Sequence, residues 1–171
     1  MPVCPDCGYD NIAGIDECEK CGQSITELTN VKPTSPLAKG LVKDSIDSLS
    51  PRSPVAVSPE ESVGNVLNLL VNNHIGCVLV VENDNLVGIF SERDALIQLN
   101  TEATGLKQRP IKEFMTDSPS TLEGHDTIAF AVHKMSLGGY RHVPVLTDGK
   151  PTGVISIRDV LRYATERQQS A

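Results

Sequence analysis

The sequence predicts an α+β fold: two copies of one β-α-β-β-α unit that follow a small cysteine-rich module. The stretch GIFSERDAL at 88–96 returns 65 positions later as GVISIRDVL at 153–161. Within each copy, helix-like apolar spacing alternates with short apolar runs that are bounded by turn residues. Four of the five cysteines lie in the first 21 residues. A repeated unit and a separate cysteine module explain these patterns together.

The composition is that of a globular protein with an aliphatic core. Of the 171 residues 39% are hydrophobic, but only 4% are aromatic and tryptophan is absent. The formal net charge of −7 argues against a chain-wide surface for nucleic acid or anionic membranes. No apolar run is long enough for a membrane span, and the N-terminus lacks the basic and apolar regions of a signal peptide. We expect a cytoplasmic protein without membrane association.

Two Cys-x-x-Cys pairs, each followed by glycine, form the cysteine-rich module at 1–23. Two sulfurs three positions apart in a tight turn can occupy two corners of a tetrahedron, and the glycine lets the backbone curl beneath a metal. Two disulfides or a redox-active pair are the alternatives, but a redox pair explains one motif only. The predicted ligands of one structural Zn²⁺ are Cys4, Cys7, Cys18 and Cys21.

These cysteine motifs resemble a minimal zinc ribbon of rubredoxin-like knuckles. A closed site of four thiolates leaves no open position for catalysis, so we expect the ion to be structural. The module is acidic, which favours an unidentified protein partner over nucleic acid. Residues 24–43 mix Ser, Thr, Pro, Gly and Lys without sustained periodicity and are predicted to be a linker.

The two repeats are predicted at 44–100 and 109–165, and they align without a gap. Ile46 aligns with Ile111, and the first signature aligns with the second. Helices are expected near 62–73 and 126–139, the latter with Asp126 as N-cap. Each is followed by two strands, at 77–81 and 86–90 and at 142–146 and 152–156. The predicted buried face of the first helix comprises Val63, Val66, Leu67, Leu70 and Val71.

The repeat length, the element order and the twice-seen signature Gly-h-h-Ser-x-x-Asp, where h is apolar, resemble a pair of cystathionine β-synthase (CBS) domains, also called a Bateman module. The resemblance covers about residues 42–165. It implies a sandwich-like pair with approximate twofold symmetry, two clefts between the repeats and a homodimer.

The serine and aspartate of each signature have two compatible interpretations. Ser-x-x-Asp is a capping box that starts the closing helix. An aspartate can also accept hydrogen bonds from the two neighbouring hydroxyls of ribose. The resemblance implies contacts of ribose or phosphate with Ser91, Asp94, Ser156 and Asp159. Candidate adenine contacts are Val57, Ile75 and Val78 in the first repeat and Leu122, Tyr140 and Val143 in the second.

The repeats differ where a phosphate would need cations. Arg141 and His142 resemble the basic pair of nucleotide-sensing CBS proteins, whereas the aligned residues of the first repeat are Gly76 and Cys77. The resemblance implies that the basic pair complements Asp94, so we predict a phosphate-binding cleft at Asp94. The cleft at Asp159 is predicted to be empty, weaker or suited to an uncharged nucleoside tail. Solvated cations at an exposed strand start are the alternative. Cys77 is predicted to be a small core residue.

The sequence contains no catalytic constellation and no phosphate loop of the GxxxxGK[ST] type, so we expect a non-enzymatic protein. The favoured function is regulatory sensing of an adenosyl ligand: AMP, ADP, ATP or S-adenosylmethionine. One alternative is a ligand-free adaptor that dimerises and presents the zinc ribbon. Another is a transcription- or RNA-associated regulator, which the acidic ribbon disfavours.

Overall fold

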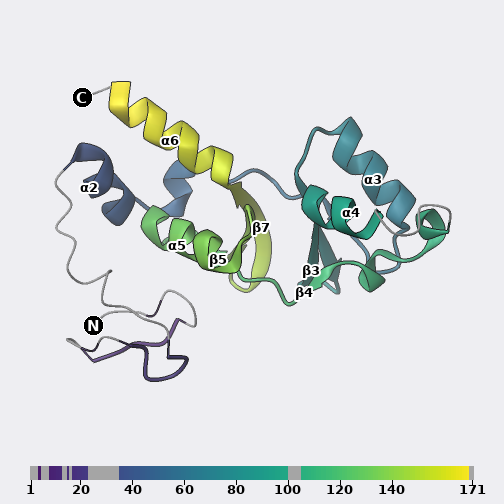
Figure 1. Cartoon of the computed structure of the whole chain (residues 1–171), viewed down its shortest axis with the longest axis horizontal. Coiled ribbons are helices and arrows are strands. Elements are labelled where there is room, and N and C mark those ends of the chain that lie inside the picture. The colour runs from purple at the N-terminus through teal and green to yellow at the C-terminus, as the bar shows by residue number, and fades with distance from the viewer. Residues whose placement is uncertain are drawn as a thin grey trace. The chain divides into compact units, whose positions relative to one another are not determined.

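The structure is a computed structural model that describes residues 4, 8–12, 15, 17–22, 35–99 and 105–169. The chain forms two compact units (Figure 1). Unit 1 comprises Met1–Leu49, His125–Arg141 and Ile157–Ala171, and unit 2 comprises Ser50–Gly124 and His142–Ser156. Each unit therefore contains segments of both repeats.

Unit 2 contains two β-sheets. The first has the strand order β1-β2-β3-β4, with β1 and β2 parallel and the other neighbours antiparallel. The second has the order β5-β6-β7, again with one parallel and one antiparallel pair. The strands are β1 (Ala56–Val57), β2 (Cys77–Glu82), β3 (Asn85–Ser91), β4 (Thr116–Asp117), β5 (Leu122–Glu123), β6 (His142–Thr147) and β7 (Lys150–Ser156).

The hairpins of the two repeats have the same register. Cys77 pairs with Ser91 in the first hairpin, and the aligned His142 pairs with Ser156 in the second. Both hairpins contain an irregularity at the aligned place, between Val80 and Val81 and between Val145 and Leu146. The two turns also share positive φ angles, at Asn83 and Asp84 and at Asp148 and Gly149, as a tight hairpin requires. The predicted duplication therefore extends to the hydrogen-bonded register.

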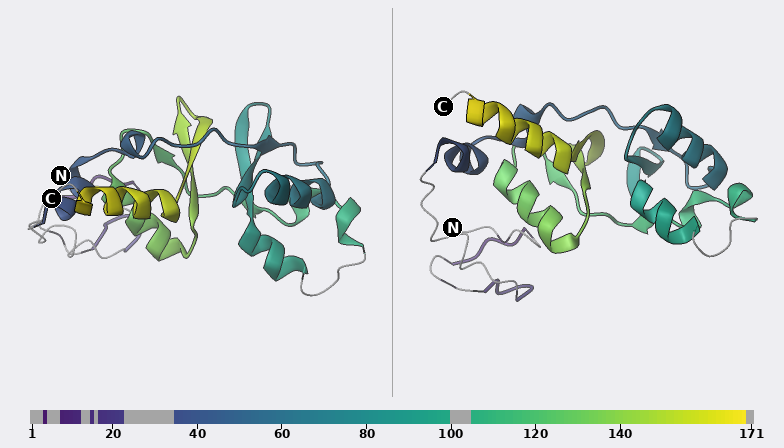
Figure 2. Two further views of the ribbon diagram at one scale, coloured as in Figure 1. Left: turned by 90° about the horizontal axis from the view of Figure 1, so that it is seen from above. Right: turned by 45° about the horizontal axis from the view of Figure 1, so that its top comes forward.

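The two faces of the first sheet pack against different partners. The core on one face includes residues of α3 (Val63–Asn72) and α4 (Glu92–Leu99). Cys77, Leu79 and Ile89 point to the other face, where Val154 of β7 packs against them. Figure 2 shows the helices on one side of this sheet and the second sheet on the other. The buried helical-side core is Val63, Val66, Leu70, Val78, Val80, Phe90, Ala95 and Ile111.

Each sheet receives a short segment from the other repeat. The strand β4 belongs to the second repeat and pairs with Gly88 and Ile89 of the first. In return, Arg52 of the first repeat exchanges two backbone hydrogen bonds with Val154 of the second, at 3.1 and 2.9 Å. The sequence alone did not predict this exchange.

The helix α3 begins at a serine cap, and the residue His74 that follows its C-cap has a positive φ angle. The hydroxyl of Ser62 accepts a hydrogen bond from the amide of Asn65 at 3.3 Å. Beyond the helix, His74 has a φ of 51°, whereas the aligned residue after α5 is Gly139, which has a φ of 64°. The prediction that Val71 belongs to the buried face is wrong, because its side chain is 70% exposed near the end of the helix.

The described residues of unit 1 form the helices α2 (Pro36–Lys43), α5 (Ile128–Gly138) and α6 (Ile157–Gln169), together with a 3-10 turn at Ile46–Leu49. Helix α2 lies in the range that the sequence predicts as a linker, and Ser35 caps its start. The cap of α5 is Thr127, whose hydroxyl accepts from the amide of Phe130 at 3.2 Å. The prediction of Asp126 as N-cap is therefore wrong by one residue, and the carbonyl of Asp126 accepts from the amide of Ile46 instead.

A polar cluster joins the end of α2 to α6. The carboxylate of Asp44 accepts hydrogen bonds from the hydroxyl of Tyr163, at 2.5 Å, and from the guanidinium of Arg167. Burial raises the pKa of Tyr163 to about 12, and the hydrogen bond to Asp44 adds to the rise. A Cβ on Gly40 would lie 2.3 Å from the Tyr163 hydroxyl, so α2 approaches α6 closely because this residue is glycine.

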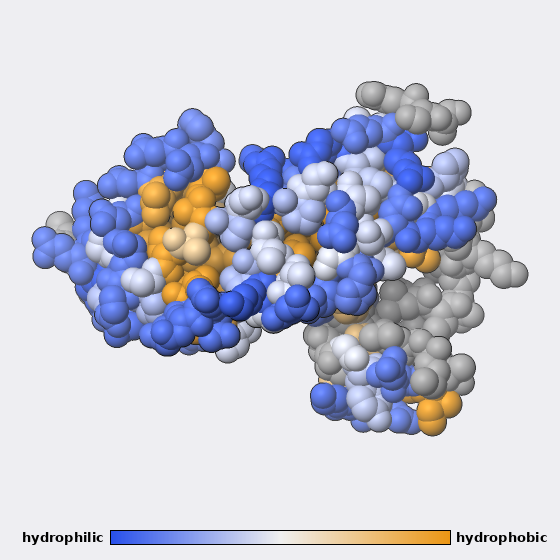
Figure 3. Space-filling model, turned by 180° about the vertical axis from the view of Figure 1, so that it is seen from behind, coloured by the Kyte–Doolittle hydropathy of each residue, from blue (hydrophilic) through white to orange (hydrophobic). Residues whose placement is uncertain are grey.

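The described surface is mostly hydrophilic on the face that Figure 3 shows, and an apolar area gathers over the part of unit 2 that contains the first sheet. Within the described residues, no helix combines the length and the apolar character that crossing a membrane requires.

Candidate functional site

Three of the four predicted zinc ligands lie together. The sulfurs of Cys4, Cys18 and Cys21 all lie within 4.8 Å of one another, and those of Cys4 and Cys21 are 3.5 Å apart. Sulfurs about 2.3 Å from one tetrahedral zinc are separated by roughly 3.8 Å, so these three fit a shared ion. Within the described part of the chain, no disulfide joins two of these three cysteines. Cys7 lies outside the described residues.

The two cysteine turns have the same backbone geometry. The amide of Gly8 donates to the carbonyl of Cys4 at 2.9 Å, and the amide of Gly22 donates to the carbonyl of Cys18 at 2.8 Å. The φ angles of these glycines, 70° and 72°, are in the left-handed region that glycine adopts without strain. The described ends of the two turns therefore match.

In the first repeat, the signature residues form the predicted capping box. The carboxylate oxygen Oδ2 of Asp94 accepts from the amide of Ser91 at 2.8 Å and from its hydroxyl at 2.7 Å. Asp94 is half-buried at the start of α4. Within the described part of the chain, no cationic side chain forms an ion pair with it. The cap thus uses Oδ2 and leaves the negative charge without a protein counterion.

Unit 2 places His142 close to this signature. The carbonyl of Gly76 accepts from the amide of Glu92, the first residue of α4, at 3.0 Å. A Cβ on Gly76 would lie 2.3 Å from Nε2 of His142, so the imidazole rests directly on the Gly76 backbone. Gly76 therefore joins the start of α4 to the first residue of β6.

Cys77 pairs with Ser91 of the same signature and is a buried core residue, as predicted. Its side chain is buried in the sheet face that packs against β7. Burial raises the pKa of its thiol to about 12, and the negative charges of Asp94 and Glu92 add to the rise.

The aspartate of the second signature, Asp159, lies in unit 1, and its surroundings differ from those of Asp94. Asp159 is only 3% exposed, and its Oδ1 forms an ion pair with the guanidinium of Arg162 at 3.0 Å. The residue of the first repeat that aligns with Arg162 is Ile97. The aspartates thus differ in burial and in counterion, and the i,i+3 spacing of Asp159 and Arg162 is a sequence signal for the pair.

Two further predicted residues line a surface hollow of unit 1. Tyr140 and Arg141 border a depression of about 290 Å³ between the end of α5 and the start of α6. The ring of Tyr140 covers Gly138, where a Cβ would lie 1.8 Å from a ring carbon. Arg141 is exposed, and its carbonyl accepts from the amide of Ile157 at 2.9 Å.

The apolar residues predicted to contact adenine belong largely to the core. Val57 and Ile75 pack against the cluster that contains Val78, which is itself fully buried. Leu122 and Val143 are 2% and 0% exposed. Their side chains therefore offer little surface to a ligand.

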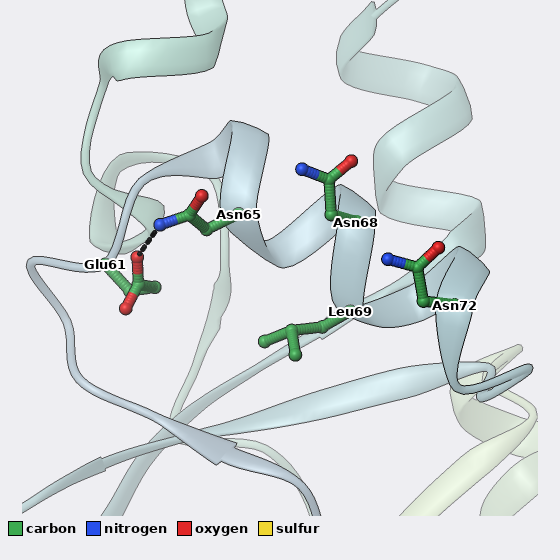
Figure 4. A pocket seen from close by; sticks show the side chains of 5 residues that line it. All are labelled: Glu61, Asn65, Asn68, Leu69 and Asn72. Carbon is green, nitrogen blue, oxygen red and sulfur yellow. Dashed lines mark hydrogen bonds between the residues drawn. The ribbon is translucent and has the colours of Figure 1, made fainter.

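A depression on α3 contains none of the predicted residues. It measures about 320 Å³ and is lined by Glu61, Asn65, Asn68, Leu69 and Asn72. Figure 4 shows the three carboxamides along the helix, with Asn65 donating to Glu61 at 2.9 Å. The asparagine spacing of i, i+3 and i+7 was readable in the sequence, but nothing in the structure assigns this depression a ligand.

Solved structures share this fold. A CBS-domain-containing protein of Agrobacterium tumefaciens is 32% identical, with a TM-score of 0.64 over 72% of this chain and 98% of that one. A CBS-domain protein of Pyrobaculum aerophilum, solved in complex with AMP, is 26% identical, with a TM-score of 0.63 over 74% of this chain and 99% of that one.

Curated relatives include an uncharacterised 33.4 kDa protein of Thermofilum pendens, encoded in a ribosomal RNA operon. It is 27% identical over 84% of this chain, but the match spans only 47% of its own length. The CBS-domain family model matches residues 46–100 and 111–166. This double match covers more than half of the sequence, so the chain belongs to the CBS-domain family and carries the domain in tandem.

Proposed function

We propose that this protein is a regulatory module that binds an adenosine nucleotide at Asp94. The observation that carries the proposal is the half-buried Asp94 carboxylate, which lacks a protein counterion within the described residues and lies near Gly76 and His142 of the same unit. A carboxylate of this kind can accept the two hydroxyls of a ribose. The similar protein of Pyrobaculum aerophilum, which was solved with AMP, supports the ligand class.

His142, the first residue of β6, offers a basic group to a phosphate at the Asp94 site. His142 lies against Gly76, and Arg141 precedes it in the chain and is exposed. Hydrogen bonds between cationic donors and phosphate are among the stronger polar contacts. We propose that His142 gives the Asp94 site its preference for phosphorylated ligands, and that Asp94 and His142 are its main polar contacts.

The second signature has a lower affinity in this proposal. Asp159 already has a cationic partner in Arg162, so a ribose would have to compete with the guanidinium. In the first repeat the aligned position holds Ile97, which offers Asp94 no such partner. We therefore propose one nucleotide per chain.

We further propose that the module binds its ligand without converting it. Asp94 accepts two hydrogen bonds from Ser91, so this carboxylate is held in place as an acceptor at the start of α4. Regulation then requires that the ligand prefer one arrangement of the protein over another.

The cysteine module is proposed to hold one structural zinc ion that stabilises the ribbon. The three clustered sulfurs support this, because a module this small buries too little apolar surface to fold without the metal. Metal analysis of purified protein is expected to give one zinc per chain, and chelation is expected to unfold the ribbon alone.

A ligand-free adaptor is the second candidate function. The Ser91–Asp94 capping box supports it, because the cap alone accounts for both signature side chains. In this case the tandem domains would form a homodimer and present the ribbon to a protein partner.

Isothermal titration calorimetry separates the two functions. Wild-type protein is titrated with AMP, ATP and S-adenosylmethionine, alongside Asp94→Asn and Asp159→Asn. Asparagine retains an acceptor for Ser91 and so preserves the cap while it removes the charge. Loss of a charge-assisted contact of about 1.5–3 kcal/mol predicts roughly 10- to 100-fold weaker binding for Asp94→Asn. Asp159→Asn is expected to bind as the wild type does, and absence of binding by all three ligands would favour the adaptor.

A further inference from the structure

One polar side chain is buried inside the cysteine module. Asn11 is 1% exposed, although asparagine normally lies at the surface. Its Nδ2 donates to the carbonyl of Tyr9 at 2.8 Å, and its Oδ1 accepts from the amide of Glu19 at 3.1 Å. Both ends of the carboxamide are therefore bonded to main chain.

These two contacts lie on opposite halves of the module. The carbonyl of Tyr9 also accepts from the amide of Cys4 at 2.8 Å, so it belongs to the first cysteine turn. Glu19 follows Cys18 directly and lies within the second Cys-x-x-Cys pair. Asn11 thus bridges the two turns that bring the sulfurs of Cys4 and Cys18 together.

The bridge requires both a donor and an acceptor in one short side chain. Aspartate has the same shape, but it would direct an oxygen at the Tyr9 carbonyl and bring a negative charge near the thiolates. Alanine would remove both bonds and leave the two main-chain groups buried without the carboxamide. The structure therefore selects asparagine among residues of this size.

We propose that Asn11 is a positioning residue that fixes the two cysteine turns relative to each other and thereby sets the affinity of the site for a tetrahedral metal ion. This inference rests on the proposed zinc site. Residues that orient metal ligands without touching the metal typically change the affinity by about 10- to 100-fold when they are replaced.

The test measures metal affinity in the full-length chain. Wild type, Asn11→Asp, Asn11→Ala and Ile12→Ala are compared by competition of zinc with a chromophoric chelator and by the absorption bands of bound Co²⁺. Ile12 is the matched control, because it is the next residue and its side chain is 62% exposed. Thermal unfolding of the tandem CBS domains, followed by circular dichroism, checks that the rest of the chain is intact.

The proposal predicts zinc binding that is about 10- to 100-fold weaker in both Asn11 variants, and wild-type affinity in Ile12→Ala. In zinc-loaded protein, the amide of Glu19 should exchange slowly in the wild type and rapidly in Asn11→Ala. Equal zinc affinity in all four proteins, or a Glu19 amide that still exchanges slowly in Asn11→Ala, would overturn the inference about Asn11. Neither result would contradict the proposed metal site. A wild type that gives no tetrahedral Co²⁺–thiolate spectrum would remove the metal site and the inference together.

Discussion

The first repeat begins its hairpin with Gly76 and Cys77, whereas the second begins with Arg141 and His142, although the hairpins share one register. The signature aspartates differ as well. Asp94 is half-buried and caps its helix, whereas Asp159 is almost fully buried and pairs with Arg162. The duplicated backbone therefore holds two chemically different sites. The two repeats differ in these polar side chains, although their hairpins share one register.

The difference shows which positions each repeat needs for folding. The apolar positions of the hairpins are filled in both copies, as Phe90 and Ile155 illustrate with exposures of 1% and 0%. The strand starts carry no common side chain, because the first repeat has the buried Cys77 where the second has the half-buried His142. Changes at the two classes of position should consequently have different effects.

The largest contrast is expected in the reactivity of Cys77, at the position where the second repeat has His142. Because the thiol pKa is raised from 9.0 to about 12, the native thiolate fraction near neutral pH falls on the order of a thousandfold. Mass spectrometry after iodoacetamide treatment should find Cys77 unlabelled in native, chelator-treated protein, while the ribbon cysteines react. Rapid native labelling of Cys77 would contradict its burial.

The raised pKa of the Cys77 thiol makes the free energy of unfolding depend on pH. The unfolded thiol releases its proton near pH 9, whereas the native thiol retains it until about pH 12. The contribution of Cys77 to the free energy of unfolding is therefore fully present below pH 9 and lost between pH 9 and 12. Cys77→Ala should show a shallower loss of stability than the wild type over this range in urea titrations.

Truncation of the shared core should affect both repeats strongly. Phe90→Ala is expected to lower the free energy of unfolding by about 3–5 kcal/mol, and Ile155→Ala by about 2–5 kcal/mol, because each leaves a cavity. The exposed Ile97→Ala serves as control, with an expected change within about 0.5 kcal/mol. Denaturant unfolding measures all three, and a negligible cost at Ile155 would show that the second sheet is less well packed than the first.

Gly76→Ala tests the contact between the strand starts. Its Cβ would lie 2.3 Å from Nε2 of His142, so we expect a loss of about 1–3 kcal/mol in unfolding free energy from overpacking. In the His142→Ala background the same substitution should cost almost nothing, because the imidazole is gone. Additive costs in this double-mutant cycle would show that the two residues do not touch.

The smallest expected change in stability concerns the residues that follow α3 and α5. His74 has a φ of 51° where the aligned residue is Gly139, so His74→Gly should stabilise the protein by about 0.5–1 kcal/mol. Gly139→Ala should destabilise it. Thermal unfolding of both variants is sufficient, and a destabilised His74→Gly would mean that the imidazole makes a compensating contact.

Features that depend on local pattern could be predicted from the sequence. The hairpins, the Ser91–Asp94 capping box and the pairing of cysteine turns follow from spacing within a few residues. The exchange of Arg52 and β4 between sheets could not be predicted, because it consists of very short pairings between distant segments. The cap of α5 was misplaced because Asp126 and Thr127 are both capping residues, and the contact of Asp126 with Ile46 decides between them.

The candidate site was predictable in part. The signature residues and the cysteines were found because their spacing is a motif, and Cys77 was placed in the core by its apolar neighbours. Val78 and Val143 were predicted as adenine contacts that act largely through main-chain groups, and the structure shows that their side chains are fully buried. The counterion of Asp159 was missed because Arg162 lies outside the signature.

The most direct test of the central claim, a nucleotide site at Asp94 but not at Asp159, is the AMP titration of Ile97→Arg by calorimetry. This substitution gives Asp94 the i,i+3 cation that Asp159 has. Leu96→Arg adds the same charge at i+2, which does not face Asp94. The account predicts one AMP per wild-type chain, about tenfold weaker binding in Ile97→Arg and wild-type binding in Leu96→Arg. Two AMP per wild-type chain, or equal affinity in both arginine variants, would contradict it.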